Sequence, residues 1–245
     1  MRTYGLIGNP VGHSASKQLF DNKFASDGRD NYCYELYELS DASHLHDWVR
    51  QEQLSGFNVT LPYKEEAYKQ ADWLSDEAQA IGAVNVIAVE EGTGLLRGYN
   101  TDAPAFEQTL LPLLQPWHTS ALVLGTGGAA KAVAYTLRKL GIDCLLVSRT
   151  PRQGQSIGYQ QAEEEARQRY LIVNATPVGM SPNEALSPWQ DIHLLSPRHL
   201  CYDLVYNPEE TRFMLEAELA GATVKNGMEM LQLQAALSWK IWNLI

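Results

Sequence analysis

The feature that most constrains the fold of this sequence is a regular alternation of short apolar runs with segments of helical length. The short runs are rich in β-branched and other apolar residues, and the longer segments place apolar residues at helical spacing between charged ones. Such alternation is typical of α/β proteins, in which helices connect largely parallel strands. A chain of 245 residues can form one large α/β domain or two smaller ones.

The first hundred residues show this pattern clearly. We expect strands at residues 4–8, 32–39, 56–60, 84–89 and 95–99, and helices at 16–26, at 43–53 and directly after Pro62. The last two strands flank the turn-rich residues 91–94, so we expect them to pair with each other.

The pattern starts again after Asp102, and we place a domain boundary there. A helix at 104–114 is followed by strands expected at 121–124, 143–148, 170–174 and 200–205, with helices at 128–140, at 160–168 and from Pro208. The final segment, 228–245, carries one apolar helical face, formed by Leu231, Ala235, Ser238, Trp242 and Ile245. That face needs a partner, which we expect in the first domain.

A glycine-rich loop joins the strand at 121–124 to the following helix. It contains Gly125, Gly127 and Ala130 in the pattern G-x-G-x-x-A, which in a strand–turn–helix context is typical of dinucleotide binding. Glycine permits a tight turn and a close approach of the pyrophosphate, and the helix N-terminus offers free N–H groups. A tight turn with no ligand uses the same residues, so the motif alone leaves both interpretations open.

The end of the next strand indicates which dinucleotide would bind. An NAD site carries Asp or Glu there to hold the ribose 2′-OH, but this chain has Ser148, Arg149, Thr150, Pro151 and Arg152. Guanidinium groups form paired, charge-assisted hydrogen bonds with phosphate, so the residues favour NADP. The alternative is a solvated basic loop, which is unexpected beside a glycine motif in a chain with 19 Lys and Arg against 29 Asp and Glu.

Polar side chains also stand at strand ends in the first half. Ser14 and Ser16 follow the first strand, and Lys64 begins a helix shortly after the strand at 56–60. Serines in such places are ordinarily helix N-caps, and a lysine is ordinarily a solvated surface charge. A cation at a helix N-terminus, however, opposes the helix dipole, so Lys64 indicates a role other than helix stability. The polar residues in 82–85 and 98–102 are typical of turns as well as of ligand sites.

Composition excludes several classes of function. The formal net charge of −10 disfavours a protein that binds nucleic acid or an anionic membrane. We see no apolar stretch near the ~18 residues of a membrane span, and no export signal. Cys33, Cys144 and Cys201 are interpreted as buried thiols in a reducing cytoplasm, and the six scattered histidines predict no metal site.

Taken together, these segments resemble the shikimate dehydrogenase family over nearly the whole chain. The resemblance is carried by GNPVGHSAS (8–16), GFNVTLPYKEEA (56–67), GAVNV (82–86), NTD (100–102), GTGGAAKA (125–132), SRT (148–150), NATPVGM (174–180), YDLVY (202–206) and GMEMLQLQAA (227–236). It implies a substrate-binding catalytic domain at 1–102 plus 228–245, a Rossmann-type NADP-binding domain at 103–227, a cleft between them, and a last helix that returns to the first domain.

The resemblance also implies the reaction, which is the reversible NADPH-dependent reduction of 3-dehydroshikimate to shikimate in the chorismate pathway of aromatic amino-acid biosynthesis. Lys64 and Asp102 would be the catalytic pair. Substrate contacts would fall on Ser14, Ser16, Thr60, Lys64, Asn85, Asp102, Tyr206 and Gln234. Cofactor contacts would fall on Gly125, Thr126, Gly127, Gly128, Ala129, Arg149, Thr150 and Arg152, and more loosely on Asp76, Thr176, Leu204 and Gly227.

The chain departs from the family pattern at several positions. Lys17 stands where Pro is frequent, Asp21 where His is frequent, Ser148 where Asn is common, and Pro177 where Ser is common. Three alternatives therefore stay open: a quinate/shikimate dehydrogenase, a catalytically silent ligand-binding protein, and a methyltransferase that uses the glycine loop for S-adenosylmethionine. Lys64 and Asp102 argue against the silent protein, and the arginines have no role in the methyltransferase. A homodimer is also left open.

Overall fold

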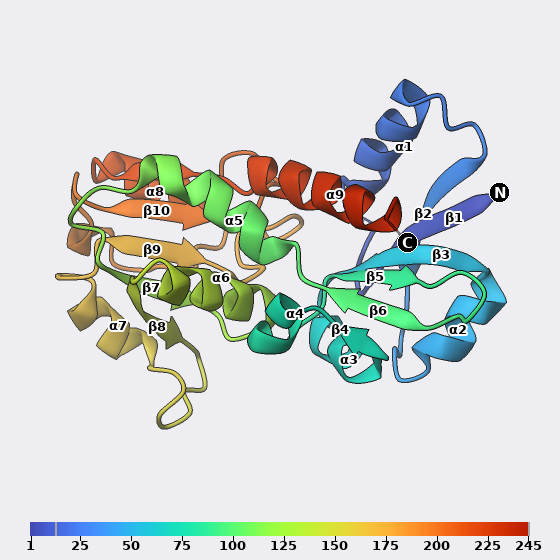
Figure 1. The fold of residues 1–245 in the computed structure, drawn as a ribbon. Helices are drawn as coiled ribbons and strands as arrows, with labels where there is room; N and C mark the ends of the chain where they lie inside the picture. Colours follow the sequence, from blue (N-terminus) through green and yellow to red (C-terminus); the bar gives the residue numbers. More distant parts are fainter. Residues whose placement is uncertain (13, 245) are drawn as a thin grey trace. The chain divides into compact units, whose positions relative to one another are not determined.

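The computed structural model describes residues 1–12 and 14–244, which form two compact units. The first unit contains Met1–Asp102 and Gln232–Ile245, and the second contains Ala103–Leu231. Both chain ends belong to the first unit (Figure 1). His13, within the resembling segment 8–16, and Ile245, predicted on the face of the last helix, lie outside the described residues. That the first unit binds the substrate and the second unit binds the cofactor stays a prediction.

The first unit is built around a six-stranded sheet with the order β2-β1-β3-β5-β6-β4. Its strands are β1 (Arg2–Gly8), β2 (Tyr32–Glu38), β3 (Leu54–Val59), β4 (Trp73–Leu74), β5 (Val86–Val89) and β6 (Leu96–Tyr99). The predicted pairing of β5 with β6 is confirmed. This sheet is mixed rather than largely parallel, because the short connection from β5 to β6 can only join antiparallel strands.

Four helices of the first unit connect its strands. They are α1 (Ser16–Ser26), α2 (Leu45–Glu52), α3 (Lys64–Gln70) and α4 (Asp76–Ile81). The sequence did not predict β4 or α4, because two and six residues are too few to show a period. Local signals do mark α4, since the Ser75 hydroxyl accepts a hydrogen bond from Ala78 N at 3.2 Å and Gly82 ends the helix with φ 72°.

The last helix, α9 (Met228–Trp242), packs on the first sheet over its C-terminal half, which confirms the predicted return. The Trp242 indole N–H donates to the Ile87 carbonyl oxygen at 2.9 Å. Trp239 and Trp242 join a core of aromatic side chains from β1, β2 and α1. The predicted apolar face is correct for Ala235, Ser238 and Trp242, which are buried, but Leu231 is only partly buried and Trp239 is buried in its place.

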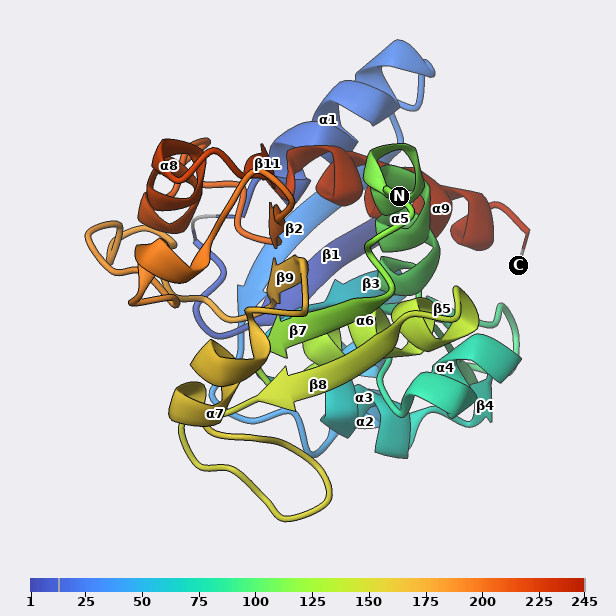
Figure 2. The same ribbon diagram turned by 90° about the vertical axis from the view of Figure 1, so that its left-hand side faces the viewer.

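The second unit contains a parallel five-stranded sheet with the order β11-β10-β9-β7-β8; Figure 2 shows β7 and β8 running in the same direction. Its strands are β7 (Ser120–Leu124), β8 (Asp143–Val147), β9 (Leu171–Asn174), β10 (Leu200–Asp203) and β11 (Thr223–Lys225). The chain passes from β7 to β8 on one side and then to β9 on the other, which creates the switch point where parallel sheets bind ligands. These features confirm the predicted α/β class with a Rossmann-like sheet.

The helices beside this sheet are α5 (Asp102–Leu110), α6 (Gly128–Lys139), α7 (Tyr159–Glu165) and α8 (Arg212–Leu219), with 3₁₀ turns at Leu111–Leu113 and Ile192–Leu194. The structure differs from the sequence predictions at β11 and at α8. The three-residue strand β11 was not predicted, and α8 begins at Arg212 rather than at Pro208. The reason for the later start is that Thr211 is the N-cap, whose side chain accepts a hydrogen bond from Met214 N.

Candidate functional site

Lys64 and Asp102 form a nearly buried ion pair in the first unit. Lys64 opens α3 shortly after β3, and Asp102 opens α5 shortly after β6. The Lys64 Nζ lies 2.6 Å from Asp102 Oδ2, and the two side chains are 12% and 8% exposed. An ion pair this buried is tolerated only if further hydrogen bonds satisfy its polar atoms.

Asn85 supplies those further hydrogen bonds. Its side-chain Nδ2 donates to Asp102 Oδ1 and to Thr101 Oγ1, both at 2.9 Å, while its Oδ1 accepts from Thr101 N at 2.7 Å. The same Nδ2 lies 3.4 Å from Gln234 Oε1 on α9. Both oxygens of Asp102 are therefore engaged, and four of the predicted substrate residues meet in one cluster.

Ser14, Ser16 and Thr60 lie at the same edge of the first sheet as this cluster. They follow β1 and β3, which are parallel neighbours, so their carboxyl ends adjoin. The Ser14 hydroxyl donates to Ser16 Oγ at 3.1 Å and accepts from Ser16 N at 3.2 Å. Ala15, at the N-cap position, makes no side-chain cap, but the Ser14 hydroxyl accepts from the N–H of Ser16, the first residue of α1. The N-cap interpretation is therefore wrong for Ser16, whereas Ser14 does satisfy the first N–H group of the helix.

Asn58 is a buried residue beside this cluster, and its sequence context predicted no role for it. Its side chain accepts from the Tyr34 hydroxyl at 2.8 Å and donates to Ser238 Oγ at 2.9 Å and to the Asn85 carbonyl oxygen at 3.3 Å. Asn58 thus ties β2, β3 and α9 to the segment that holds Asn85. The available signal was a polar side chain inside an otherwise apolar strand, which predicts a buried hydrogen-bonded group.

The glycine loop of the second unit has the backbone geometry that the motif predicts. Gly125 has φ 114°, and a Cβ at this position would lie 3.1 Å from the Ala175 carbonyl oxygen. Gly127 is the N-cap of α6 and provides no side-chain cap, while Gly128 is buried at the first helical position. The first N–H groups of α6 are therefore available for an anion, and the helix dipole favours one there.

Arg149, Thr150 and Arg152 follow β8, the strand next to β7. All three residues are exposed. Among the described residues, neither guanidinium has an ion-pair partner. Two exposed cations without a carboxylate nearby in the sequence suit a phosphate group, which would supply the opposite charge. The charge and exposure of these residues suit NADP, and the cofactor contacts assigned to them stay predictions.

Thr176, Leu204 and Gly227 also lie at the carboxyl edge of the second sheet. Thr176 follows β9, and Leu204 follows β10 and donates from its backbone N–H to the Asn174 carbonyl oxygen at 2.9 Å. Gly227 lies against the Leu204 carbonyl, where any Cβ would collide with backbone atoms. Three of the four loosely assigned cofactor residues are thus close to the edge that carries the glycine loop.

Two assigned residues lie in a different unit from the rest of their set. Asp76, assigned to the cofactor, begins α4 in the first unit, and Tyr206, assigned to the substrate, belongs to the second. Both assignments stay predictions.

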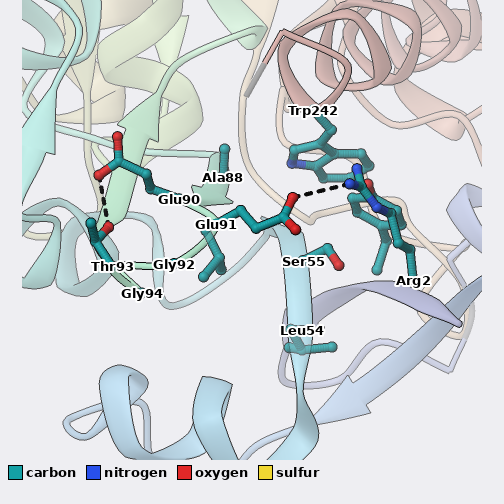
Figure 3. A pocket seen from close by; sticks show the side chains of 12 residues that line it. Arg2, Leu54, Ser55, Ala88, Glu90, Glu91, Gly92, Thr93, Gly94 and Trp242 are labelled. Carbon is teal, nitrogen blue, oxygen red and sulfur yellow. Dashed lines mark hydrogen bonds and ion pairs between the residues drawn. The ribbon is translucent and has the colours of Figure 1, made fainter.

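A separate cavity of about 520 Å³ opens at the other edge of the first sheet. It lies by the starts of β1 and β3, and the Arg2–Glu91 ion pair of 3.2 Å crosses it (Figure 3). The residues that line it include none of those assigned to substrate or cofactor. Its charged groups already have partners, since Arg2 pairs with Glu91 and Glu90 pairs with Arg97 outside the cavity, and this distinguishes it from the exposed arginines after β8.

Three further properties concern metals, membranes and thiols. Among residues 1–12 and 14–244, no group of three or more His, Cys, Asp or Glu side chains could hold a metal ion. No helix in that part of the chain is long and apolar enough to cross a membrane. The three cysteines are free thiols. The prediction that all are buried is correct only for Cys201, since Cys33 and Cys144 are partly buried.

Comparison with known proteins gives one consistent family. Residues 6–87 match the model of the shikimate dehydrogenase substrate binding domain. The shikimate dehydrogenase (NADP(+)) of Pyrococcus abyssi is 37% identical over 99% of this chain and 92% of its own length. The crystal structure of the Thermus thermophilus shikimate 5-dehydrogenase in complex with NADP(H) and shikimate superposes with a TM-score of 0.86, at 37% identity over 100% of this chain and 94% of that one.

A solved quinate dehydrogenase from Corynebacterium glutamicum in complex with NAD is also similar. It is 25% identical to this chain and superposes with a TM-score of 0.85. The match covers 100% of this chain and 94% of the quinate dehydrogenase. The relatives named shikimate dehydrogenase share more sequence with this chain over the same extent. The chain belongs to the shikimate dehydrogenase family.

Proposed function

We propose that this protein catalyses the reversible reduction of 3-dehydroshikimate to shikimate with NADPH. The observation that carries the proposal is the Lys64–Asp102 pair, held at 2.6 Å and almost out of solvent in a member of this family. Reduction of a ketone needs a hydride at carbon and a proton at oxygen. Bound NADPH would supply the hydride, and this chain must supply the proton donor.

Lys64 is the proton donor in this mechanism. Its ammonium group has three N–H bonds, one of which donates to Asp102. As hydride reaches the ketone carbon, negative charge develops on the oxygen, and a second N–H of Lys64 donates its proton there. In the oxidation direction, the neutral amine takes the proton back from the shikimate hydroxyl.

Asp102 orients Lys64 and helps to hold the substrate ring. Because Asn85 fixes Asp102 Oδ1 and Lys64 contacts Oδ2, the carboxylate has one orientation before the substrate binds. Its position at the start of α5 is favourable for a negative charge. A ring hydroxyl that donates to this carboxylate would lie within reach of Lys64.

The remaining polar groups would recognise the substrate. Thr60 and Gln234 present a hydroxyl and an amide, which can donate to and accept from ring hydroxyls, and the Asn85 amide oxygen can accept from one. Ser14 and Ser16, whose hydroxyls are 3.1 Å apart, can both donate to one carboxylate.

The second unit would bind the cofactor. The free N–H groups at the start of α6 suit the pyrophosphate, and Gly125 and Gly127 allow its close approach. Arg149 and Arg152 suit the 2′-phosphate that distinguishes NADP from NAD. The methyltransferase alternative gives these arginines no ligand, since S-adenosylmethionine carries no phosphate.

An absorbance assay tests the proposal. Purified protein is mixed with shikimate or quinate and with NADP+ or NAD+, and formation of the reduced nicotinamide is followed. We expect shikimate with NADP+ to be the best pair and quinate to be much poorer. Equal rates with shikimate and quinate would favour a quinate/shikimate dehydrogenase. No turnover together with saturable shikimate binding in a calorimeter would favour the silent binding protein.

We also infer a cytoplasmic location and leave the oligomeric state to experiment. The inference is supported by the three free thiols, because a reducing compartment keeps cysteines unpaired. Light scattering of the purified protein would distinguish a monomer from the homodimer that the sequence left open.

A further inference from the structure

Asp203 is a buried carboxyl group, at the end of β10, that the proposed mechanism does not use. Asp203 is 0% exposed. Oδ1 accepts from Val205 N and from Asn174 Nδ2, both at 2.9 Å, and Oδ2 accepts from the Thr211 hydroxyl at 2.7 Å. Burial of an acidic group disfavours folding unless hydrogen bonds compensate for the lost water. The three hydrogen bonds compensate for this loss, and in turn they restrain Val205, Asn174 and Thr211.

The Asp203 carboxylate and the Val178 carbonyl oxygen together orient the Asn174 amide. Both groups can only accept, and Asn174 Nδ2 donates to Asp203 Oδ1 at 2.9 Å and to the Val178 carbonyl oxygen at 3.2 Å. The amide oxygen then faces the following loop, where it accepts from Thr176 N at 3.0 Å and from the Thr176 hydroxyl at 2.6 Å. Reversal of the amide would place two donors against the Thr176 N–H.

Thr176 lies beside the glycine loop. It follows β9, which is the neighbour of β7 at the switch point of the sheet. Its methyl carbon would lie 3.2 Å from a Cβ at Gly125. A displacement of the Thr176 loop would therefore change the surface presented to a dinucleotide at this edge.

We propose that Asp203 is a positioning residue for the dinucleotide, which orients the Asn174 amide and thereby holds the Thr176 loop beside Gly125. This inference rests on the proposed function, because it takes that edge to bind NADP. The hydrogen bond from Thr211 to Asp203 connects the carboxylate to α8 and not to the Thr176 loop. The Thr211 hydroxyl also accepts from Met214 N at 3.3 Å and caps α8.

Two matched variants distinguish the contact of Asp203 with Asn174 from its contact with Thr211. Asn174→Ala removes the link to Thr176, and Thr211→Val removes the link to α8. Each loses buried hydrogen bonds, so both should lower Tm. Only Asn174→Ala should raise the Kd for NADP+, by about tenfold, as expected when a binding loop loses a hydrogen bond that holds it. The KM for shikimate should stay at the wild-type value in both.

Asp203 itself is tested with a conservative and a disruptive variant. In Asp203→Asn, the amide oxygen can still accept from Val205 and Asn174, and the NH₂ group can donate to Thr211, so the Kd for NADP+ should stay near that of the wild type. Asp203→Ala removes all three contacts and should raise this Kd, but by no more than Asn174→Ala does, because Asn174 keeps its own hydrogen bonds to Val178 and Thr176. If Asp203→Ala does not fold, the Asn174 and Thr211 variants still test whether the link to Thr176 is what holds the loop.

Tyr202→Phe is the control for a loss of stability alone. Tyr202 precedes Asp203 on β10 and points to the other face of the sheet, where its hydroxyl lies 2.7 Å from the Thr109 hydroxyl. This variant should lower Tm and leave the Kd for NADP+ unchanged.

Calorimetric titration of NADP+ without substrate provides the deciding measurement. Equal rises of Kd in the Asn174 and Thr211 variants, or an unchanged Kd in a folded Asn174→Ala protein, would overturn the positioning role. If the wild type binds NADP+ but does not oxidise shikimate, the proposed function is wrong, and the Kd values of the variants still test the positioning role of Asp203. A wild type that does not bind NADP+ would overturn both.

Discussion

The catalytic candidates in the first unit and the cofactor candidates in the second are constructed differently. Lys64, Asp102 and Asn85 hold one another through side-chain hydrogen bonds and are nearly buried. The second unit offers backbone N–H groups and two exposed arginines. A proton donor must be in place before the substrate arrives, whereas a phosphate brings the charge that orders an arginine. Fixed side chains thus indicate the chemical step, and free charges indicate ligand recognition.

The largest effect is expected where the side chains are fixed. Lys64→Ala removes the proton donor and should lower kcat by ~10²–10⁴, the usual contribution of a positioned acid or base. Substrate affinity should fall less. Steady-state kinetics with shikimate and NADP+ measure both. A normal kcat in Lys64→Ala would show that Lys64 is not the proton donor, and that the fixed side chains of the first unit do not mark the chemical step.

A double-mutant cycle asks whether the fixed pair acts as one unit. Asp102→Asn keeps the size and one acceptor oxygen but loses the charge, so it should lower kcat and weaken shikimate binding. Since Lys64 and Asp102 are in direct contact, the double variant should be far less impaired than the product of the single effects. Strictly multiplicative losses of kcat would show that the two residues act independently.

The exposed arginines should affect recognition rather than chemistry. A charge-assisted contact contributes on the order of 1.5–3 kcal/mol, or about one to two decades of affinity. Replacement of both Arg149 and Arg152 with Ala should weaken NADP+ binding by at least this factor and leave NAD+ binding and the kcat at saturating cofactor nearly unchanged. Titrations with the two cofactors provide the test. Equal losses for NADP+ and NAD+ would mean that the arginines have a structural role.

An effect on stability distinguishes the buried Asp203 carboxyl group of the second unit from Asp102 in the first unit, whose charge is paired with Lys64. Burial raises the pKa of Asp203 to about 6 from its ordinary value of 3.8. Because the folded state holds the proton more tightly, the stability from Asp203 is fully present below pH 3.8 and is lost as the pH rises through about 6.

Asp203→Asn removes this titration. Relative to the wild type, the variant should therefore gain unfolding free energy, on the order of 2–3 kcal/mol, between pH 4 and pH 8. Urea unfolding of both proteins at several pH values measures the difference, in which groups common to both cancel. A difference that does not vary with pH would contradict the raised pKa of Asp203.

Much of the fold could be predicted because its longer elements are periodic. The structure places α1 at Ser16–Ser26, as predicted, and β7 with α6 flank the glycine loop as the motif requires. The missed elements, β4, α4 and β11, have two to six residues and show no period. The antiparallel direction of β5 follows from its pairing with β6, which was predicted, yet its place beside β3 depends on the order of the whole sheet.

The order of amino acids specifies which chemical groups are available and at which element ends they stand: Lys64 at a helix start, the glycines between strand and helix, and the arginines after the next strand. Which of these groups meet depends on how the elements pack. Lys64 and Asp102 are 38 residues apart, and Asn58 and Ser238 are 180 apart. The physical reason is that a side-chain hydrogen bond acts over about 3 Å, so these partners exist only once the strands have taken their order in the sheet.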